Sequence, residues 1–407
     1  MRYFIQYPAG TSELVADAMS HFVDDFRAEY QDDSAMLFSS SSPMERVADI
    51  PFAKNAFAVI SEIRRGDINA NVAQLAGSLK KSQFPPLPGP RARGFRVMVH
   101  IDGELASVAG APKREIERTV SACTGMRLEP SGRGQEYWVI GRLDMRDLMF
   151  CARLPKPARP KKARGALSHE LSSMLVLASE PRPEDTFLDP FAGSGSFVVA
   201  RLSLPAREVV YSDLDLADHR ELLPGEVLRD RRLRLLDEDA MDLPSVPDGS
   251  VDAVVTDPPW GEHEELPVPY EEFARTTALS LARVLNPAKG RYVLLCARRG
   301  APAFDAALTE AGLAVRQTHE ILVNGHPATV FVGDRRTGTE PSQQTEEPQQ
   351  SRRAQESQES QHSQEPQEPG TPQDRQGGER RQAPRTPAKP LLIGMGTYRR
   401  SLNRFSR

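Results

Sequence analysis

The sequence predicts an α/β protein built on a doubly wound, mostly parallel sheet, preceded by a smaller α+β region and followed by a disordered tail. Between Thr186 and Asp334, short apolar runs alternate with amphipathic runs of helical period, which is the pattern of a parallel sheet covered on both faces. Before Phe150, strand-like and helix-like runs follow one another less regularly. After Asp334 the composition turns to Gln, Pro, Glu and Ser, which predicts disorder.

These changes divide the chain into five predicted segments. They are an N-terminal α+β region at 1–150, a basic Pro-rich linker at 151–165, the α/β domain at 166–334, a disordered tail at 335–390 and a short basic motif at 391–407. The linker follows from prolines and like charges in ARLPKPARPKKARG. The tail follows from a stretch whose only hydrophobic residues are three alanines, which buries too little apolar surface to offset chain entropy. For the terminal motif, a frayed end and a docking segment both remain open.

The individual elements follow from hydrophobic periodicity. Strands are predicted at 2–7, 95–101, 135–143, 186–189, 208–213, 233–240, 251–257, 291–297 and 328–334. Helices are predicted at 11–26, 113–126, 194–204, 269–286 and 304–312.

Composition and charge narrow the class of protein. Hydrophobic residues make up 39% and charged residues 27%, which is ordinary for a soluble globular protein. The formal net charge of −4 means that a nucleic acid would have to be bound by local basic patches. Cys123, Cys151 and Cys296 lie far apart, which favours a reducing cytoplasm and argues against disulfides or a zinc site.

The sequence also predicts no membrane partner and no metal. Its start lacks a basic stretch followed by an apolar run, so no signal peptide is expected, and no apolar stretch reaches the ~20 residues that cross a bilayer. His263 has no second ligand at helical spacing. We therefore expect a cytoplasmic protein that is monomeric and binds neither membrane nor metal.

Polar and glycine residues follow the predicted strands where each one ends. In DPFAGSGSF, a strand ends at Asp189, and Gly193 and Gly195 form a tight turn before a helix. Ligands of such sheets bind at the carboxyl ends of the strands, and glycine lets the backbone approach a ligand closely. The Gly-Lys-Ser/Thr ending of a triphosphate-binding loop is absent. A plain strand–helix turn is the alternative.

Acidic residues follow the next two strands. Asp213 ends YSD and could accept the ribose hydroxyls of a nucleoside-bearing cofactor, with Asp215 as the competing candidate and a helix cap as the structural alternative. Asp239, in DEDA, could accept a hydrogen bond from an adenine amino group. Acidic residues after strands are common, so Asp239 taken alone is weak evidence for an adenine-binding site.

The sharpest motif is TDPPWG. A buried strand runs directly into Asp257, Pro258, Pro259 and Trp260, and the two prolines remove two backbone donors, so the turn presents carbonyl oxygens. Together with the Asp257 carboxylate these acceptors could orient an exocyclic base amine, and Asp257 could take up the proton released on bond formation. Trp260 offers a flat face to an extruded base. The alternative is a proline turn with a packed Trp.

A basic run lies in the predicted linker. It consists of Arg153, Lys156, Arg159, Lys161, Lys162 and Arg164, with no acidic residue among them. Contact with RNA phosphates is one interpretation, and a solvated linker is the other. Lys80, Lys81, Arg91 and Arg93 form a smaller basic group.

With these motifs in this order, the sequence resembles the THUMP-domain RNA methyltransferases, especially those that make N2-methylguanosine in tRNA. The resemblance covers most of residues 1–333 and includes RGALSHELSSMLVLAS before the first motif, PAGTSELVADAM near the start and, more loosely, FRVMVHI with its following helix. It implies a Rossmann-like class I methyltransferase domain behind an N-terminal ferredoxin-like and THUMP region that grips tRNA.

The resemblance also implies roles for individual residues. S-adenosylmethionine would be bound by Asp189, Phe191, Gly193, Gly195, Ser196, Asp213, Asp239 and Ala240. Asp257, Pro258, Pro259 and Trp260 would hold the target base. The sequence departs from the family at three positions, since Trp260 replaces the more usual Tyr or Phe, Ser196 stands where Thr is common, and Ala200 lacks an acidic side chain often seen there.

The predicted function is methyl transfer from S-adenosylmethionine to a base amine in RNA, with guanine N2 in tRNA as the first choice. An adenine-amine methyltransferase acting on RNA or DNA is the first alternative, because Trp in this motif also occurs in adenine and cytosine amine methyltransferases. A non-catalytic THUMP-type RNA-binding protein is the alternative from another class, and the intact turn at 257–260 speaks against it.

Overall fold

The computed structural model describes residues 1–157, 166–261, 266 and 268–335. All of these described residues belong to one compact unit. The predicted disordered tail beyond Arg335 and the predicted basic motif at 391–407 lie outside the described residues.

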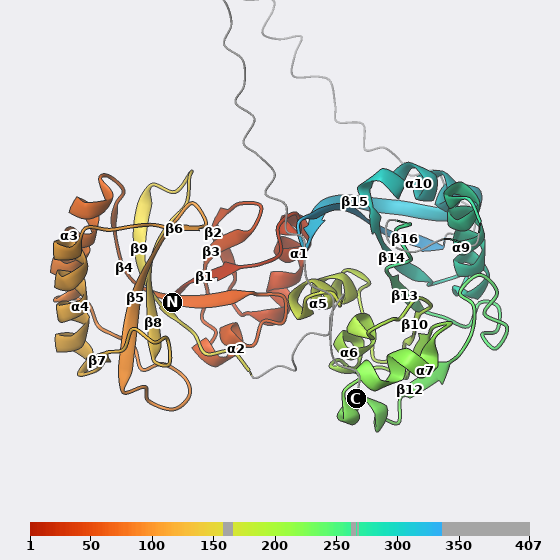
Figure 1. Cartoon of the computed structure of the whole chain (residues 1–407), viewed down its shortest axis with the longest axis horizontal. Helices are drawn as coiled ribbons and strands as arrows, with labels where there is room; N and C mark the ends of the chain where they lie inside the picture. Colours follow the sequence, from red (N-terminus) through yellow and green to blue (C-terminus); the bar gives the residue numbers. More distant parts are fainter. Residues whose placement is uncertain (158–165, 262–265, 267, 336–407) are drawn as a thin grey trace, which may run out of the picture. The chain divides into compact units, whose positions relative to one another are not determined.

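The first part of the compact unit is a nine-stranded mixed sheet with four helices (Figure 1). The strands are β1 (Arg2–Gln6), β2 (Arg27–Gln31), β3 (Ala35–Ser39), β4 (Asn55–Arg64), β5 (Gly94–Ile101), β6 (Glu104–Leu105), β7 (Arg127–Leu128), β8 (Gln135–Gly141) and β9 (Asp147–Arg153). Their order is β2-β3-β1-β4-β9-β8-β5-β6, with β7 paired to β5. The helices are α1 (Ser12–Phe22), α2 (Met44–Ala48), α3 (Ile68–Leu79) and α4 (Gly110–Thr124).

One face of this sheet carries the hydrophobic core against the helices. Tyr3, Ala58, Ala152, Tyr137 and Val97 are paired side by side across five strands and are all buried against helical residues. Side chains alternate between the faces of a strand, so the neighbouring residues in sequence point to the opposite face.

The structure corrects the predicted N-terminal boundaries. Strand β9 continues through Cys151 to Arg153, because its last residue still pairs with Phe57 of β4, so the predicted linker does not begin at 151. The helix predicted over 11–26 ends at Phe22, and β2 begins at Arg27. The sequence did not predict β2, β3, β4, β9 or α3.

The second part is a seven-stranded sheet. Its strands are β10 (Thr186–Asp189), β11 (Glu208–Ser212), β12 (Leu233–Leu236), β13 (Ala253–Thr256), β14 (Arg291–Ala297), β15 (Leu313–Val323) and β16 (His326–Arg335). Its helices are α5 (His169–Ala178), α6 (Ser196–Leu202), α7 (Leu216–His219), α8 (Gly225–Leu228), α9 (Tyr270–Val284) and α10 (Ala301–Glu310), with 3₁₀ turns η1 (Arg220–Leu222) and η2 (Arg298–Gly300).

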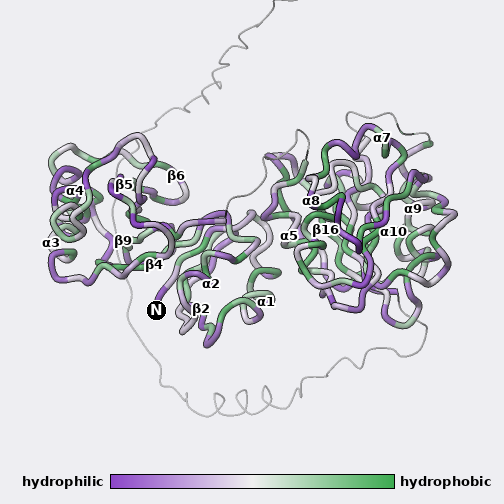
Figure 2. The backbone as a smooth tube through the Cα atoms, turned by 90° about the horizontal axis from the view of Figure 1, so that it is seen from below, coloured by the Kyte–Doolittle hydropathy of each residue, from purple (hydrophilic) through white to green (hydrophobic). Residues whose placement is uncertain are grey.

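The sheet order is β12-β11-β10-β13-β14-β16-β15, with β10 to β14 parallel and β16 antiparallel to both of its neighbours. Helices α5 and α6 pack on one face, where Phe187 and Val209 are buried, and α9 and α10 pack on the other, where Leu188 and Val210 are buried. The predicted doubly wound, mostly parallel sheet is confirmed. Figure 2 shows the hydrophobic residues concentrated inside this part and the hydrophilic ones mainly along its outer turns.

Two differences from the prediction have simple causes. The strand predicted over 233–240 ends at Leu236, and Asp239 therefore lies in a loop. Strand β15 was not predicted because the middle of its sequence, Arg316 to Thr318, is polar and irregularly paired at the edge of the sheet.

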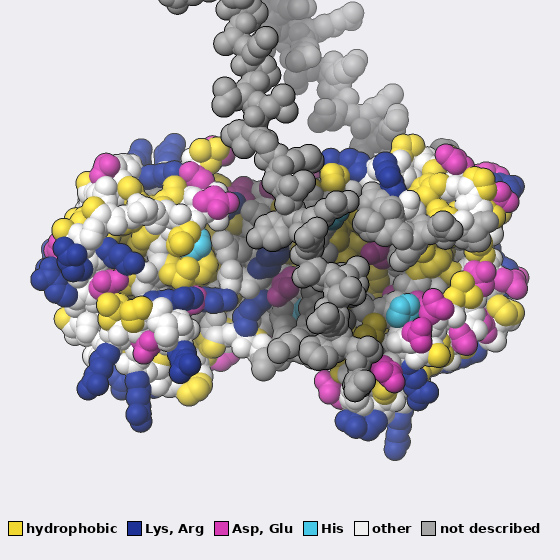
Figure 3. Space-filling model, viewed as in Figure 1, with side chains coloured by type: hydrophobic (Ala, Val, Ile, Leu, Met, Phe, Trp, Pro, Cys, Tyr) yellow, Lys and Arg dark blue, Asp and Glu magenta, His cyan; other side chains and the backbone are white. Residues whose placement is uncertain are grey.

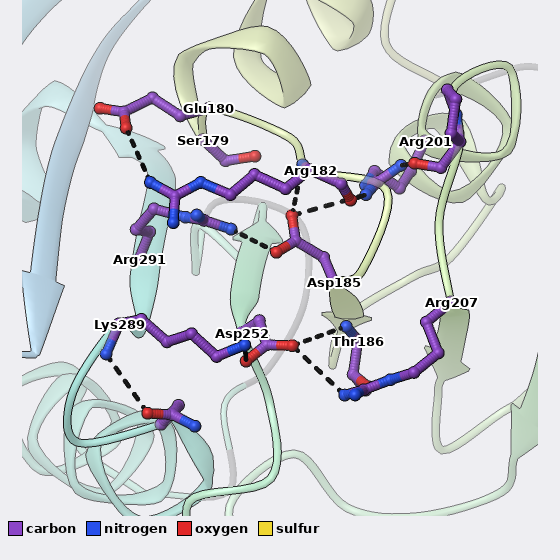
Figure 4. Close-up of polar contacts among 12 residues, drawn as sticks. Ser179, Glu180, Arg182, Asp185, Thr186, Arg201, Arg207, Asp252, Lys289 and Arg291 are labelled. Atoms are coloured by element: carbon purple, nitrogen blue, oxygen red, sulfur yellow. Dashed lines mark hydrogen bonds and ion pairs between the residues drawn. The ribbon is translucent and has the colours of Figure 1, made fainter.

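A buried ionic network joins the amino ends of three strands (Figure 4). Asp185, 1% exposed just before β10, accepts a 2.7 Å hydrogen bond from Arg291 at the start of β14 and lies 3.5 Å from the guanidinium of Arg201 in α6. Asp252, before β13, accepts from the backbone N–H of Thr186 and pairs with Lys289. The parallel strands are thus tied together at the edge opposite their carboxyl ends.

We expect Asp185→Ala to lower the free energy of unfolding by about 3–5 kcal/mol, because it leaves two buried guanidinium groups without their shared carboxylate. Urea unfolding would measure the change. Asp248→Ala is the matched control, since the side chain of Asp248 is 78% exposed and pairs with Arg283 at the surface, where an ion pair contributes about 1 kcal/mol or less. Equal effects of the two substitutions would contradict the role of burial.

Candidate active site

The predicted strand-end residues follow neighbouring parallel strands and so lie at one edge of the second sheet. Strand β10 lies between β11 and β13, and chain order reverses at this point, so a crevice is expected at the carboxyl ends of these strands. Asp189 ends β10, Asp213 follows β11 and Asp257 follows β13. Three segments far apart in the sequence therefore bring their carboxylates to the same edge.

Asp189 forms the floor of this edge and is only 1% exposed. Its carboxylate accepts hydrogen bonds from the hydroxyl of Thr256 in β13, at 3.1 Å, and from the backbone N–H of Phe191, at 3.3 Å. Burial raises the pKa of Asp189 well above its usual range, and the nearby charges of Asp257 and Asp213 raise it further. In this structure Asp189 ties two strands together below the surface of the site.

The raised pKa of Asp189 predicts a pH-dependent stability. Since the folded-state pKa lies above the unfolded value, the stability is fully present below the unfolded pKa, near 4, and is lost as the pH rises through the folded pKa. Asp189→Asn keeps an acceptor for Thr256 but cannot ionise. Between pH 5 and pH 8, we expect the free energy of unfolding to fall less in the variant than in the native chain. The difference should be about 1.4 kcal/mol for each unit by which folding raises the pKa of Asp189 within this range. Urea unfolding measures this difference. If the free energies of unfolding of the two proteins change equally across this pH range, Asp189 does not have a raised pKa.

The glycine turn owes its shape to two different requirements. Gly193 has φ +48°, and a Cβ added there would meet no atom within 4 Å, so the backbone faces open space. Gly195, at the start of α6 with φ +75°, would place a Cβ 2.2 Å from Leu223. Gly193 thus leaves room for a ligand, whereas glycine at 195 is favoured by the left-handed backbone, and a side chain there would also have to displace a methyl group of Leu223.

Asp213 holds the glycine turn. Its carboxylate accepts hydrogen bonds from the backbone N–H of Gly193 at 2.7 Å, from the N–H of Asp215 at 2.9 Å and from Nδ1 of His219 at 3.0 Å. A carboxylate has about four acceptor positions, so a ligand that needs two must displace one of these donors. His219, with its side chain 34% exposed, is the donor that can turn away. Asp215, the competing candidate, is exposed and caps no helix through its side chain.

The other predicted cofactor residues lie around this turn. Phe191 is half-buried and packs against Phe273 of α9, with the two ring centroids 5.9 Å apart. Ser196 begins α6, and its hydroxyl lies 3.1 Å from that of Ser194. Asp239 is exposed and accepts from the N–H of Met241 at 2.9 Å. Ala240 is buried, and its carbonyl accepts a 2.7 Å hydrogen bond from Ser280 of α9.

The turn after β13 is held by its own side chains. Trp260 Nε1 donates to Asp257 Oδ1 at 2.7 Å, across the two prolines. Pro258 is buried, whereas Pro259 and Trp260 are half-buried, and the Trp260 ring packs against hydrophobic residues of the core. The turn is therefore a braced corner that carries a carboxylate.

Of two residues outside the predicted set, Arg299 contacts this corner directly, and Tyr270 lies near enough for the charge of Asp257 to act on its phenol. Arg299, in η2, donates to the carbonyl oxygen of Trp260 at 3.2 Å. The ring of Tyr270 packs against Phe304. Its hydroxyl lies close to Gly300, where an added Cβ would be only 2.1 Å from the hydroxyl oxygen. Neither Arg299 nor Tyr270 stands in a recognisable sequence motif. Both belong to segments that follow the turn in the chain. The pair of basic residues that follows the apolar run RYVLLCA was the one available signal.

The predicted basic run is only partly described. Arg153 pairs with Glu136 at 2.8 Å, on the N-terminal sheet. Lys156 pairs with Glu170 of α5 at 3.1 Å and donates to the carbonyl of Ala53. These two cations are thus paired with carboxylates from other segments of the chain. Arg159, Lys161, Lys162 and Arg164 lie outside the described residues.

The described part of the chain contains neither a candidate metal centre nor a candidate membrane span. Its His, Cys, Asp and Glu side chains form no group of three or more that could hold a metal ion. Within the same residues, no helix combines the length and apolar character needed to cross a bilayer.

The second sheet and its helices have the fold of the class I methyltransferases. Residues 156–208 and 230–329 match the family UPF0020, described as the RMKL-like methyltransferase domain. The chain is similar to the tRNA (guanine(6)-N2)-methyltransferase of Thermus thermophilus, with 29% identity over 280 residues, 63% of this chain and 77% of the relative. It is also similar, over 26% of its length and 32% of the relative, to the tRNA (guanine(10)-N2)-dimethyltransferase of Methanothermobacter thermautotrophicus, with 35% identity.

Solved structures share the fold at low sequence identity. The crystal structure of TrmN from Thermus thermophilus has a TM-score of 0.62 at 23% identity and covers 82% of this chain and 99% of its own. That of a possible methylase from Clostridium difficile 630 has a TM-score of 0.61 at 11% identity and covers 84% and 99%. Both likenesses extend over the N-terminal part as well as the methyltransferase domain, since they exceed the length of either part alone.

Proposed function

We propose that this protein methylates guanine N2 in tRNA, with S-adenosylmethionine as the methyl donor. The observation that carries the proposal is the braced turn at 257–260, which places Asp257 at the switch point of a methyltransferase sheet. The two similar curated proteins are both named as guanine-N2 methyltransferases of tRNA.

The residues at the sheet edge fit S-adenosylmethionine. The open space before Gly193 leaves room for a ligand against the backbone, and the glycine turn is fixed by Asp213. Asp213 would hold ribose hydroxyls once His219 turns away, and the exposed carboxylate of Asp239 would accept from the adenine amine. When bound, S-adenosylmethionine supplies a methyl group on a sulfonium that leaves readily as a neutral sulfide.

The chain's own residues would orient the amine and take its proton. Asp257 and the backbone carbonyls of the turn accept the N–H groups of the exocyclic amine, which aims the nitrogen lone pair away from the acceptors. As that nitrogen gains its new bond it becomes acidic, and the Asp257 carboxylate takes up the proton. No covalent intermediate with the enzyme is needed, so positioning supplies most of the acceleration.

RNA binding would fall to the N-terminal part, which the resemblance to THUMP-domain enzymes assigns to tRNA. Lys and Arg side chains protrude from this part over α3 and α4 in Figure 3. Lys80 and Lys81 follow α3, and Arg91 and Arg93 precede β5. Such local basic groups can bind phosphates despite the acidic net charge of the chain. Action in the cytoplasm follows from the same proposal.

The test is incubation of the full chain with radiolabelled S-adenosylmethionine and unmodified tRNA, followed by digestion and nucleoside analysis. We expect the label in N2-methylguanosine, and incorporation about a thousand-fold slower with Asp257→Ala. Label in N6-methyladenosine would favour the adenine-amine alternative. Cofactor binding without any transfer, across all RNA and DNA substrates, would favour a non-catalytic RNA-binding protein.

A further inference from the structure

The predicted role of Trp260 was to stack on a base, but the structure gives its indole N–H a second task. Nε1 of Trp260 donates to Oδ1 of Asp257 at 2.7 Å, three residues back along the turn. A hydrogen bond to an ionised carboxylate is stronger than one between neutral groups. Phe has no donor in its ring, and the donor of Tyr lies at the far end of its ring.

The indole is itself held in place. Arg299 donates to the carbonyl of Trp260 at 3.2 Å, and the ring packs against hydrophobic residues of the core. Its backbone and its side chain are therefore both fixed from outside the turn. Because the indole ring is fixed, its N–H restricts the rotation of the Asp257 carboxylate to which it donates.

We propose that Trp260 is a positioning residue, whose indole N–H fixes the orientation of the Asp257 carboxylate and favours its ionised form. The kinetic part rests on the proposed function, since it assumes that Asp257 acts on a base amine. The structural part does not, because the hydrogen bond exists in the chain alone.

Several other groups surround Asp257 and must be separated from this effect. The charge of Asp257 acts on Asp189 of β10, on Cys296 of β14 and on Tyr270 of α9, although burial is the largest cause of the raised pKa of each. The cation Arg299 contacts the turn through the carbonyl oxygen of Trp260. A pH response at Trp260 therefore counts only if it requires Asp257.

The chain contains an internal control, because it has two tryptophans. Trp138, in β8 of the N-terminal sheet, donates Nε1 to Glu136 at 3.1 Å. Burial acts to raise the pKa of Glu136, but hydrogen bonds from Arg96 and Arg153 bring it below the usual range. Both indoles thus donate to carboxylates, and only one of them lies at the proposed site.

The first experiment uses the full chain with ¹⁵N-labelled tryptophan, free of cofactor and RNA. Two indole N–H signals are expected, and Trp138→Phe assigns them. We expect the Trp260 signal to shift as the pH falls and Asp257 gains a proton, and this shift to vanish in Asp257→Asn, while the Trp138 signal stays unchanged in that variant. A Trp260 signal whose pH response is the same in Asp257→Asn would overturn the proposal.

The second experiment separates positioning from stacking by kinetics. Trp260→Phe keeps an aromatic ring and removes the donor, so we expect kcat to fall about tenfold with little change in the KM for RNA. The acid limb of the kcat–pH profile should move to higher pH, because a hydrogen bond that stabilises the carboxylate is lost. In the Asp257→Ala background, which has no acceptor for the indole N–H, the same substitution should have no further effect on the residual rate.

The outcomes are distinguishable from those of the proposed function. An equal fall in both backgrounds, or an unchanged pH profile, would reduce Trp260 to a stacking surface and overturn the proposal. If the native chain methylates no guanine, the proposed function fails, and the two indole signals still decide whether Trp260 binds Asp257.

Discussion

Asp257→Ala is expected to lower kcat about a thousand-fold while the affinity for S-adenosylmethionine stays within about twofold. The substitution removes the group that would accept the proton and one of the acceptors that orient the amine, and a general base alone contributes about 10²- to 10⁴-fold. Single-turnover transfer to tRNA and calorimetric titration of the cofactor measure the two quantities separately.

Asp257→Asn is the graded companion to this variant. The amide keeps the shape of the side chain and can still accept from Trp260, but it is a far weaker base. We expect it to lose less activity than the alanine variant. Asp237→Ala, at an exposed position in the loop after β12, is the matched control and should leave kcat unchanged. Full turnover by Asp257→Ala would refute the assigned role.

Asp213→Ala is expected to weaken the binding of S-adenosylmethionine about 10- to 100-fold, as measured by calorimetry. Each hydrogen bond to a charged group contributes about 1.5–3 kcal/mol, and the carboxylate also fixes Gly193 in the turn. The loss should appear mainly in the KM for the cofactor, since Asp213 lies after a different strand from Asp257.

The control for this variant is Asp215→Ala, which removes the competing aspartate two residues away. Asp215 is exposed, and its backbone N–H, not its carboxylate, contacts Asp213. We expect cofactor affinity to be unchanged in that variant. A loss of affinity in Asp215→Ala with none in Asp213→Ala would exchange the two roles.

Sequence reasoning predicted which residues gather at this edge of the sheet, because each of the segments is continuous along the chain. Asp189 with its glycines, Asp213 and Asp257 with its prolines each follow directly on an apolar strand, and parallel strands bring their carboxyl ends to one edge. Reasoning from the sequence could not tell that Asp189 is buried beneath this edge, because burial depends on the strands beside it.

The supports of the site escaped prediction for the same reason. Arg299 braces Trp260 from 39 residues along the chain, and the hydroxyl of Tyr270 lies against Gly300. Contacts of this kind have no spacing that a linear pattern could reveal. Strands such as β15 were missed because edge strands carry polar residues on much of their length and so lack a hydrophobic period.

The sequence by itself determined the doubly wound sheet, the order of the strand-end motifs and the residue types that lie at the strand ends, because apolar periodicity and turn chemistry act over a few neighbouring residues. Only the tertiary structure decided which carboxylates are exposed, that His219 occupies an acceptor position of Asp213, and that Trp260 donates to Asp257. The physical reason is that pKa, acceptor capacity and orientation depend on atoms a few ångströms away in space, which the chain supplies from distant segments.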